Sequence, residues 1–414
     1  MAKTVTTPAT ATGALQVRSR FRFLLFQKIS AILNRRETIA QPTTKKVLFV
    51  ANTDSFINLF CLPYLRYFKQ RGYQVHVATG SLNSIAYCDQ KIDISLKRSP
   101  YRIFSNLRAT LQLKKVINEE RYQVIHCHTP VGGLVTRLAA RSFRQQSTAK
   151  VIYTAHGFHF YNGAPLFNWL IFYPVEKWLA KYTDTLITIN QEDYLRAKHD
   201  FAKRCAKIEY VQGIGVDEQK MSEKLSLAAK TKLRKSLNLK ERDFVISCIA
   251  RLDKNKNQGF IISAMAKLVQ QHQNIHLLLI GADELHGKYQ RLARKLGLEH
   301  NVHFLGFRDD VNKLIQISDL IVSASKREGL GLNVIEAIIY KKPVLATNNR
   351  GHRDILMCGQ YGYLFEDSNM DSFCYFVNKL YAQNSGTSIT NFYLKNTLRK
   401  TAQIYRNSGG SSNA

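Results

Sequence analysis

Short apolar runs alternate with longer amphipathic segments along most of the chain. In the first half, the apolar runs predict strands over residues 46–51, 75–78, 124–128, 151–154 and 185–189. An amphipathic segment over residues 59–70 predicts a helix, which Gly72 ends. Because strands and helices alternate, we expect a parallel sheet with crossover helices.

A second alternating set begins at residue 244. Its predicted strands cover residues 244–249, 277–280, 302–305, 320–323 and 343–347. Residues 220–242, between the two sets, are rich in Lys, Leu and Ser and lack strand character. The pattern predicts an α/β protein with two Rossmann-like domains that face each other across a cleft. A ligand would then lie at the carboxyl ends of both sets of strands.

The length of 414 residues agrees with this division, because it suits two domains of ~150 to 200 residues, each with its own core. The predicted parts are a basic N-terminal extension over 1–44, an N-terminal Rossmann-like domain over 45–215, a linker region over 216–240, a C-terminal Rossmann-like domain over 241–385, and a C-terminal helix with a flexible tail over 386–414.

The chain is strongly basic. It has 60 Lys and Arg against 30 Asp and Glu, and the net charge of +30 implies an anionic partner. The charge is spread from Arg18 to Arg406, and no zinc-finger, helix-turn-helix or RNA-binding aromatic signature accompanies it. We therefore favour an anionic membrane surface over nucleic acid as the partner.

Cysteine usage and hydropathy indicate the compartment. Seven scattered cysteines without a C-x-x-C spacing are typical of reduced, cytosolic thiols. No apolar run reaches the 18 residues that a membrane-spanning helix needs. We expect a cytoplasmic protein that lies peripherally on the cytosolic face of a membrane.

Two segments are candidates for the membrane contact. Residues 17–36 contain no acid and place apolar residues at helical spacing beside arginines, which predicts an interfacial helix. A helix packed on the protein or a targeting leader has the same pattern. The second candidate is an aromatic cluster near Lys177 and Lys181, which a core helix would explain in part. It comprises His159, Tyr161, Trp169, Phe172, Tyr173 and Trp178.

The densest candidate chemistry lies over residues 325–336. Here Glu328 and Glu336 bracket a glycine-rich turn between a predicted strand and a predicted helix. Gly329 and Gly331 let backbone N–H groups approach an anion, which the helix dipole also favours. A helix would hold the two carboxylates ~12 Å apart, so they suit a sugar and a ribose rather than one shared metal ion.

Other polar residues directly follow predicted strands. Arg251 and Lys256 follow the strand over 244–249, where two cations can neutralise a leaving diphosphate, although solvated surface charge is the simpler reading of each alone. His156 follows the strand over 151–154, and Gly157 beside it leaves room for a ligand. A structural hydrogen bond is the alternative role for a lone histidine.

Together these segments resemble the retaining glycosyltransferases of family 4, which have the two-domain GT-B fold. The likeness rests on the Glu-x7-Glu pattern of 325–336 and on the Arg and Lys five residues apart in 249–257. Residues 122–130 and 154–159 look like the members that build exopolysaccharide or lipid-linked oligosaccharide repeats. The likeness extends over roughly residues 45–366.

The resemblance implies a role for each motif. Glu336 would hold the ribose hydroxyls, Glu328 would hold the transferred sugar and stabilise its developing positive charge, and His156 would touch the same sugar. The backbone of the glycine turn would meet phosphate and sugar oxygens. The donor-binding residues would be Arg251, Lys256, Gly329, Leu330, Gly331, Leu332 and Glu336.

The N-terminal turn over 51–56 departs from the common Gly-Gly loop of the family. Asp54 and Ser55 are therefore candidates for acceptor contact, with His128 and His159 as further acceptor or cleft residues. His126 and His128 share one strand face, opposite Cys127, but zinc would need two more ligands nearby. No Asp-x-Asp occurs, so we expect no metal and no other cofactor.

The predicted function is a retaining hexosyl- or N-acetylhexosaminyltransferase. It would move a sugar from a nucleotide-sugar, first of all a UDP-sugar, to a polyprenyl-diphosphate-linked saccharide in surface polysaccharide or glycan assembly. Alternatives are a GT-B-fold epimerase, a phosphorylase, a non-catalytic nucleotide-sugar-binding scaffold subunit, and a charge-driven nucleic-acid binder. An epimerase would need further acid/base carboxylates, and a phosphorylase a pyridoxal-binding lysine motif that the sequence does not show.

Overall fold

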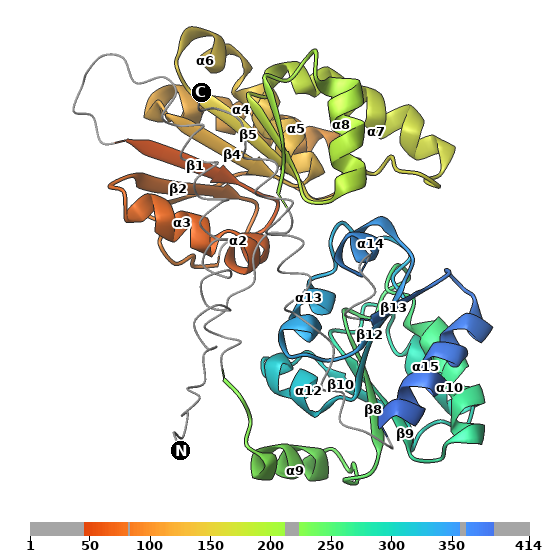
Figure 1. The fold of residues 1–414 in the computed structure, drawn as a ribbon. Helices are drawn as coiled ribbons and strands as arrows, with labels where there is room; N and C mark the ends of the chain where they lie inside the picture. The colour runs from red at the N-terminus through yellow and green to blue at the C-terminus, as the bar shows by residue number, and fades with distance from the viewer. Residues whose placement is uncertain (1–44, 82, 212–222, 357–361, 385–414) are drawn as a thin grey trace, which may run out of the picture. The chain divides into compact units, whose positions relative to one another are not determined.

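The computed structural model describes residues 45–81, 83–211, 223–356 and 362–384. These residues form two compact units, and each unit has its own parallel sheet with helices on both faces (Figure 1). The predicted α/β class with two Rossmann-like units is therefore confirmed. The predicted extension over 1–44, the domain boundary at 215, and the tail over 386–414 lie outside the described residues.

In its described part, the N-terminal unit has a seven-stranded sheet in the order β3-β2-β1-β4-β5-β6-β7. The strands are β1 (Lys46–Val50), β2 (Gln74–Thr79), β3 (Gln90–Asp93), β4 (Val124–His128), β5 (Lys150–Ala155), β6 (Thr185–Thr188) and β7 (Lys207–Tyr210). The direction of winding reverses between β1 and β4. Open α/β sheets bind ligands at the carboxyl ends of strands at such a reversal.

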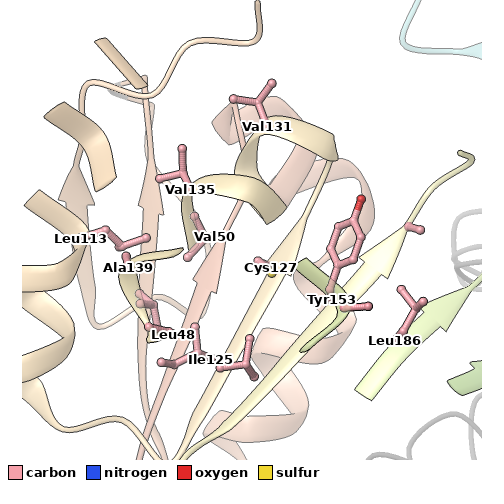
Figure 2. Packing of buried hydrophobic residues seen from close by; sticks show 14 of the residues in the cluster. Leu48, Val50, Leu113, Ile125, Cys127, Val131, Val135, Ala139, Tyr153 and Leu186 are labelled. Carbon is pink, nitrogen blue, oxygen red and sulfur yellow. The ribbon is translucent and has the colours of Figure 1, made fainter. Parts of the chain in front are cut away.

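The central strands of this sheet are buried on both faces because helices cover both. The helices are α2 (Asp54–Phe60), α3 (Leu62–Lys69), α4 (Ile103–Glu120), α5 (Pro130–Ala139), α6 (Arg141–Gln146), α7 (Leu166–Leu179) and α8 (Gln191–Phe201), with a 3-10 turn over Ala180–Tyr182. In β1, Phe49 packs with α2 and α3, whereas Leu48 and Val50 face the opposite helical layer. Figure 2 shows that layer, where Leu113 of α4 and Val135 of α5 lie over the sheet.

The C-terminal unit repeats this design with a six-stranded sheet in the order β10-β9-β8-β11-β12-β13 in its described part. The strands are β8 (Phe244–Ile249), β9 (Ile275–Ile280), β10 (Val302–Gly306), β11 (Leu320–Ser323), β12 (Val344–Thr347) and β13 (Gly362–Phe365). The winding reverses between β8 and β11. The second expected ligand position is therefore at the carboxyl ends of these two strands.

Helices cover both faces of the C-terminal sheet as well. They are α9 (Leu227–Ser236), α10 (Gln258–Gln271), α11 (Lys288–Lys295), α12 (Val311–Ile317), α13 (Leu332–Ile339), α14 (Arg350–Leu356) and α15 (Met370–Asn384). Helices α10, α11 and α15 share one core cluster with the sheet, and α9, α12, α13 and α14 pack on the other face.

All the predicted strands are present, and those over 124–128, 244–249 and 320–323 agree at both ends. The single helix predicted over 59–70 is wrong, because α2 and α3 meet at Cys61. Pro63 lies in the first turn of α3, and proline, which has no N–H to donate, favours such a position. The predicted linker region contains α9, whose N-cap Ser226 accepts a hydrogen bond from Ala229 N–H at 3.2 Å.

One charged pair lies inside the N-terminal core. Arg137 of α5 is 1% exposed and donates to Glu176 Oε2 of α7 at 2.9 Å. The Arg137 guanidinium lies 4.0 Å from the ring centroid of Tyr153, whose hydroxyl donates to Glu176 Oε1 at 3.2 Å. These contacts hold α7 against α5 and β5.

Candidate active site

The predicted donor residues lie at the winding reversal of the C-terminal sheet. Arg251 and Lys256 follow β8, and Glu328 follows the neighbouring strand β11, so all three are at the same edge. Asn255 connects the two loops by two hydrogen bonds. Its carbonyl accepts from Lys326 N–H at 2.8 Å, and its side-chain amide donates to the Arg327 carbonyl at 3.0 Å. Motifs far apart in the sequence thus form one cluster.

Lys256 and Glu328 form an ion pair in this cluster. Asp253 shapes the loop before it, because its Oδ1 accepts the N–H groups of Asn255 at 2.9 Å and of Lys256 at 2.8 Å. Burial would raise the pKa of Glu328, but the charge of Lys256, helped by His352, outweighs burial and lowers this pKa below its usual value. The Glu328 carboxylate is therefore ionised at neutral pH.

The glycine-rich loop before α13 packs tightly on the segment after β12. Gly331 has φ +84°, and a Cβ there would lie 2.9 Å from the His352 ring. A Cβ on Gly351 would lie 2.8 Å from Leu330 N and 2.9 Å from Glu328 Cβ. Leu330 is buried as a whole residue, so its predicted backbone contact to a ligand stays a prediction.

Glu336 lies about one turn inside α13. Its carboxylate has no hydrogen-bond or ion-pair partner among the described residues, and burial raises the pKa of Glu336 to about 7. A carboxylate withdrawn from water without a partner costs free energy, which hydroxyl donors of a ligand can recover. The geometry is compatible with the predicted contact to a ribose.

Arg251 is already paired in this structure. It contacts Glu284, and Asp253 lies 3.5 Å away. Its side chain is 45% exposed, so a diphosphate can reach it by replacing these carboxylates. The diphosphate contact of Arg251 stays a prediction.

In the N-terminal unit, His156 follows β5 as predicted and is half-buried. Its Nε2 lies 3.2 Å from His128 Nδ1, and the Phe56 ring packs against it edge-on at 4.9 Å. Burial lowers the pKa of His156 to about 3, so the ring is neutral at physiological pH. A neutral imidazole there can donate or accept a hydrogen bond from a sugar hydroxyl.

The structure corrects the assignment of His128 as an acceptor or cleft contact. His128 is 3% exposed, and its Nε2 lies 3.6 Å from Cys61 Sγ. His126 is equally buried and contacts Thr154 Oγ1 at 2.9 Å. In the part of the chain that the structure describes, no group of three or more His, Cys, Asp or Glu could hold a metal ion. These histidines support their neighbours instead.

Asp54 is also corrected as an acceptor contact. It is fully buried, and its carboxylate accepts from the Thr79 hydroxyl, from Asn83 N–H at 2.6 Å and from Lys91 Nζ at 2.8 Å. Because these bonds occupy both oxygens, Asp54 shapes the turn and does not face a ligand. Ser55 is exposed in the first turn of α2 and stays a prediction.

The members of the predicted aromatic cluster lie on different sides of α7 or next to it. Trp169, Phe172 and Tyr173 pack against the core, and the His159 ring packs at a tilt against Phe172, with ring centroids 4.6 Å apart. The outward side of α7 is mostly aliphatic, and its residues are sequence neighbours of the inward-facing aromatic residues. Its exposed apolar residues are Leu166, Phe167, Leu170, Ile171, Val175 and Trp178. The predicted aromatic surface is therefore wrong for three of its members, whereas Trp178 is exposed.

Sequence reasoning missed His352, which lies in α14, the helix after β12. His352 is fully buried, its Nδ1 lies 2.9 Å from Thr347 O, and its Nε2 has no partner among the described residues. The available signal was a histidine beside a glycine, as at His156, although here the pair lies in the helix after a strand. We place His352 against Gly331 in the wall of the donor site.

Family models match both units of the chain. Residues 229–392 match the model described as glycosyl transferases group 1, and residues 46–190 match the glycosyl transferase 4-like model. The two matches contain the residues of the two sites described above.

Individual relatives agree with the models. The chain is 42% identical over 371 residues to the putative glycosyltransferase EpsD of Bacillus subtilis. The aligned region covers 87% of this chain and 96% of EpsD. It is 26% identical over 276 residues to an Escherichia coli UDP-Gal:alpha-D-GlcNAc-diphosphoundecaprenol alpha-1,3-galactosyltransferase, covering 66% of this chain and 69% of that one.

Solved structures share the fold. Anabaena HepE in complex with UDP and glucose superimposes with a TM-score of 0.64 at 20% identity, covering 88% of this chain and all of HepE. Taken with the family models and the EpsD relative, the match places the present chain in the group 1 glycosyltransferases of GT-B fold.

Proposed function

We propose that the protein is a retaining transferase that takes its sugar from a UDP-sugar. The observation that carries this proposal is the donor-site arrangement: an ionised Glu328 held by Lys256 at the winding reversal, with a half-buried Glu336 on the following helix that has no ion-pair partner among the described residues. The UDP complex of HepE and the UDP-Gal named for the E. coli relative support the choice of nucleotide.

In the proposed reaction the acceptor hydroxyl attacks the sugar on the face from which the diphosphate leaves. The departing diphosphate accepts the acceptor's proton, and Lys256, Arg251 and the N-terminal end of α13 stabilise its charge. Glu328 stabilises the positive character that develops at the sugar. Because side chains supply the positive charge, we propose that neither a metal ion nor another cofactor takes part.

The proposed acceptor is a saccharide linked to a polyprenyl diphosphate, in the assembly of a surface polysaccharide. The printed activity of the E. coli relative on a diphosphoundecaprenol substrate supports this acceptor, and a capsular polysaccharide biosynthesis glycosyltransferase of Staphylococcus aureus, 24% identical over 322 residues, supports the pathway class. The exposed Ser55 remains a residue that we assign to the acceptor, and the half-buried His156 remains assigned to the transferred sugar.

The donor assignment predicts opposite effects of Glu336→Gln on UDP binding and on stability. UDP should bind ~10- to 100-fold more weakly, since a hydrogen bond to a charged acceptor contributes roughly 1.5 to 3 kcal/mol. The folded-state pKa is raised from 4.5 to about 7, so the carboxylate costs stability as pH rises through this window. The variant should therefore be more stable than the parent at pH 8, by at most ~3 kcal/mol, and not at pH 5.

Calorimetric melting with and without UDP, and with UDP-, GDP- and ADP-sugars, tests both effects. A ligand at a hundred times its Kd adds ~2.7 kcal/mol to the unfolding free energy of the parent. The exposed Glu299, replaced by Gln, is the matched control. Unchanged UDP binding in Glu336→Gln, or stabilisation of the parent by GDP- or ADP-sugars alone, would contradict the proposed donor site.

We also propose that the N-terminal unit rests on an anionic membrane surface to reach the lipid-linked acceptor. Among the described residues, no helix is long and apolar enough to cross a membrane. Two helices instead expose apolar side chains on their outward sides. On α4, Phe104 is 90%, Leu107 56% and Leu111 61% exposed, and on α7 Leu166 is 73% and Leu170 67% exposed.

Basic residues accompany both surfaces. Lys177 and Lys181 lie on or just after α7. On α4, Arg108 lies between Leu107 and Leu111, and Lys114 follows Leu111. An apolar surface with basic flanks suits the headgroup region of anionic lipid. The predicted contact by residues 17–36 lies outside the described part of the chain.

Replacing Phe104, Leu107 and Leu111 by Ser should lower binding to phosphatidylglycerol-containing vesicles at least tenfold. Each large apolar side chain contributes ~1.5 to 3 kcal/mol when fully buried, and more than half of the surface of each of these three residues is exposed. Co-sedimentation with vesicles measures the effect. Leu227 and Phe307, which are 76% and 75% exposed in the C-terminal unit, are matched controls when replaced by Ser. Equal losses in both sets would refute a specific surface on α4.

A further inference from the structure

We infer that His128, together with Cys61, is a positioning residue that sets the tautomer of His156. In this arrangement His156 carries its proton on Nδ1 and presents that N–H as a hydrogen-bond donor to the transferred sugar. The inference rests on the proposed function, because it assumes that His156 touches this sugar.

The three side chains form a short chain of contacts from the core to the edge of the sheet. Cys61 Sγ, at the junction of α2 and α3, lies 3.6 Å from His128 Nε2. His128 Nδ1 lies 3.2 Å from His156 Nε2. Cys61 is 0% and His128 3% exposed, whereas His156 is half-buried after the end of β5. His156 Nδ1 has no partner among the described residues, so it is the ring nitrogen left for a ligand.

All members of this chain are neutral. Burial raises the pKa of the Cys61 thiol above its usual range and lowers the pKa of both imidazoles. The nearest other titratable group is His126, whose ring centroid lies 4.2 Å from that of His128 and whose pKa burial lowers to about 3. Apolar rings of Phe49 and Phe56 complete the surroundings of His128. Each imidazole therefore has one N–H and one lone-pair nitrogen.

The proton positions follow from the thiol. Among the described residues, the Cys61 thiol has His128 Nε2 as its acceptor. If the thiol donates there, His128 carries its proton on Nδ1 and donates it to His156 Nε2, which leaves the His156 proton on Nδ1. The reverse order would direct a strong imidazole donor at sulfur, a weak acceptor, and would leave the thiol hydrogen without a partner. In the first order every N–H or S–H donor within the three-residue chain, other than His156 Nδ1–H, has an acceptor, so we favour it.

This arrangement restricts the chemistry of His156. Its lone pair on Nε2 is occupied by His128, so His156 cannot accept the proton of the attacking hydroxyl. His156 can donate from Nδ1 to a sugar oxygen as charge shifts during transfer. The acceptor's proton must then go to the departing diphosphate, which agrees with the proposed reaction.

The test is nitrogen NMR of the full chain labelled with 15N-histidine. We expect the parent to show His156 in the Nδ1–H form, and His128→Leu and Cys61→Ala to shift it toward a mixture of tautomers. His128→Asn, whose amide can donate from near the Nδ1 position, and Cys61→Ser, which keeps a donor, should restore the parent signal. Cys127→Ala, a buried thiol on the opposite face of β4, is the control.

Steady-state transfer gives the second readout. His128→Leu should lower kcat about tenfold, the size of one neutral hydrogen bond, with little change in donor KM, and His128→Asn should recover most of it. The inference is overturned if His156 of the parent is in the Nε2–H form. It is also overturned if the tautomer of His156 is unchanged in both His128→Leu and Cys61→Ala. If the tautomer responds as expected but the His156→Ala variant transfers sugar at the parent rate, the proposed contact between His156 and the sugar is refuted. The proposed donor site is tested separately by Glu336→Gln and is not affected by that result.

Discussion

Replacing Glu328 by Gln should lower kcat about 100- to 1000-fold while UDP binds at least as tightly as to the parent. Loss of one preorganised charge or donor at a reacting centre typically has this effect on turnover. Gln keeps the size of Glu328 and one acceptor oxygen but not the negative charge. In the parent, the charge of Lys256 keeps this carboxylate ionised. Without that carboxylate, Lys256 is released to the diphosphate, so nucleotide binding is not expected to weaken.

Calorimetric UDP titration and initial transfer rates separate these two effects. The matched control is Asp319→Asn, since Asp319 is also paired, with Arg234 at 2.8 Å, but precedes β11 whereas Glu328 follows it. The two carboxylates therefore lie at opposite ends of one strand, and only the Glu328 variant should lose turnover. Weaker UDP binding with a normal kcat in Glu328→Gln would reverse the roles we assign to the two glutamates.

Mild acid should destabilise the N-terminal unit. Burial holds the pKa values of His126, His128 and His156 below the ~6.5 of an unfolded histidine. Below pH 6.5 the unfolded chain therefore binds more protons than the folded chain, and stability falls as pH falls. Each histidine contributes up to ~1.4 kcal/mol per pH unit, so the three together contribute up to ~4 kcal/mol per unit.

The chain provides its own probe for this effect. Its two tryptophans, Trp169 and Trp178, both lie on α7, so their fluorescence follows unfolding of the N-terminal unit. We expect the urea midpoint from tryptophan fluorescence to fall steeply between pH 7.5 and 5.5. His126→Gln should reduce the slope by about a third, and replacing His199, which is 85% exposed, should not change it. A midpoint independent of pH would show that these imidazoles are not held neutral.

The fold could be predicted from the sequence where strands are buried on both faces. Strands β4, β8 and β11 are buried along nearly their whole length, and their predicted ends agree with the structure. The strands that escaped prediction are β3, β7 and β13, which lie at sheet edges. Edge strands need less apolar sequence, and β3 and β7 read Gln-Lys-Ile-Asp and Lys-Ile-Glu-Tyr.

The candidate site was predictable where one short segment carries it. The turn with Glu328 and Glu336 could be found because its glycines and acids are close in sequence. The partners of His156 could not, since Cys61 and His128 reach it from other elements, and a single sequence does not show that contact. The same reason explains Asp54, whose bonds to Thr79 and Lys91 come from neighbouring strands rather than from its own turn.

The buried pair of Arg137 and Glu176 has a consequence for the rotation of α7 about its own axis. This helix carries large apolar residues on nearly all sides, so hydrophobic packing alone would accept either Trp169 or Leu170 as the inward residue. A rotation that buried Leu170 would carry Glu176 away from Arg137 and strand a buried cation, which costs several kcal/mol. The charged pair thus fixes the rotation of α7 about its axis and keeps the aliphatic side of the helix exposed.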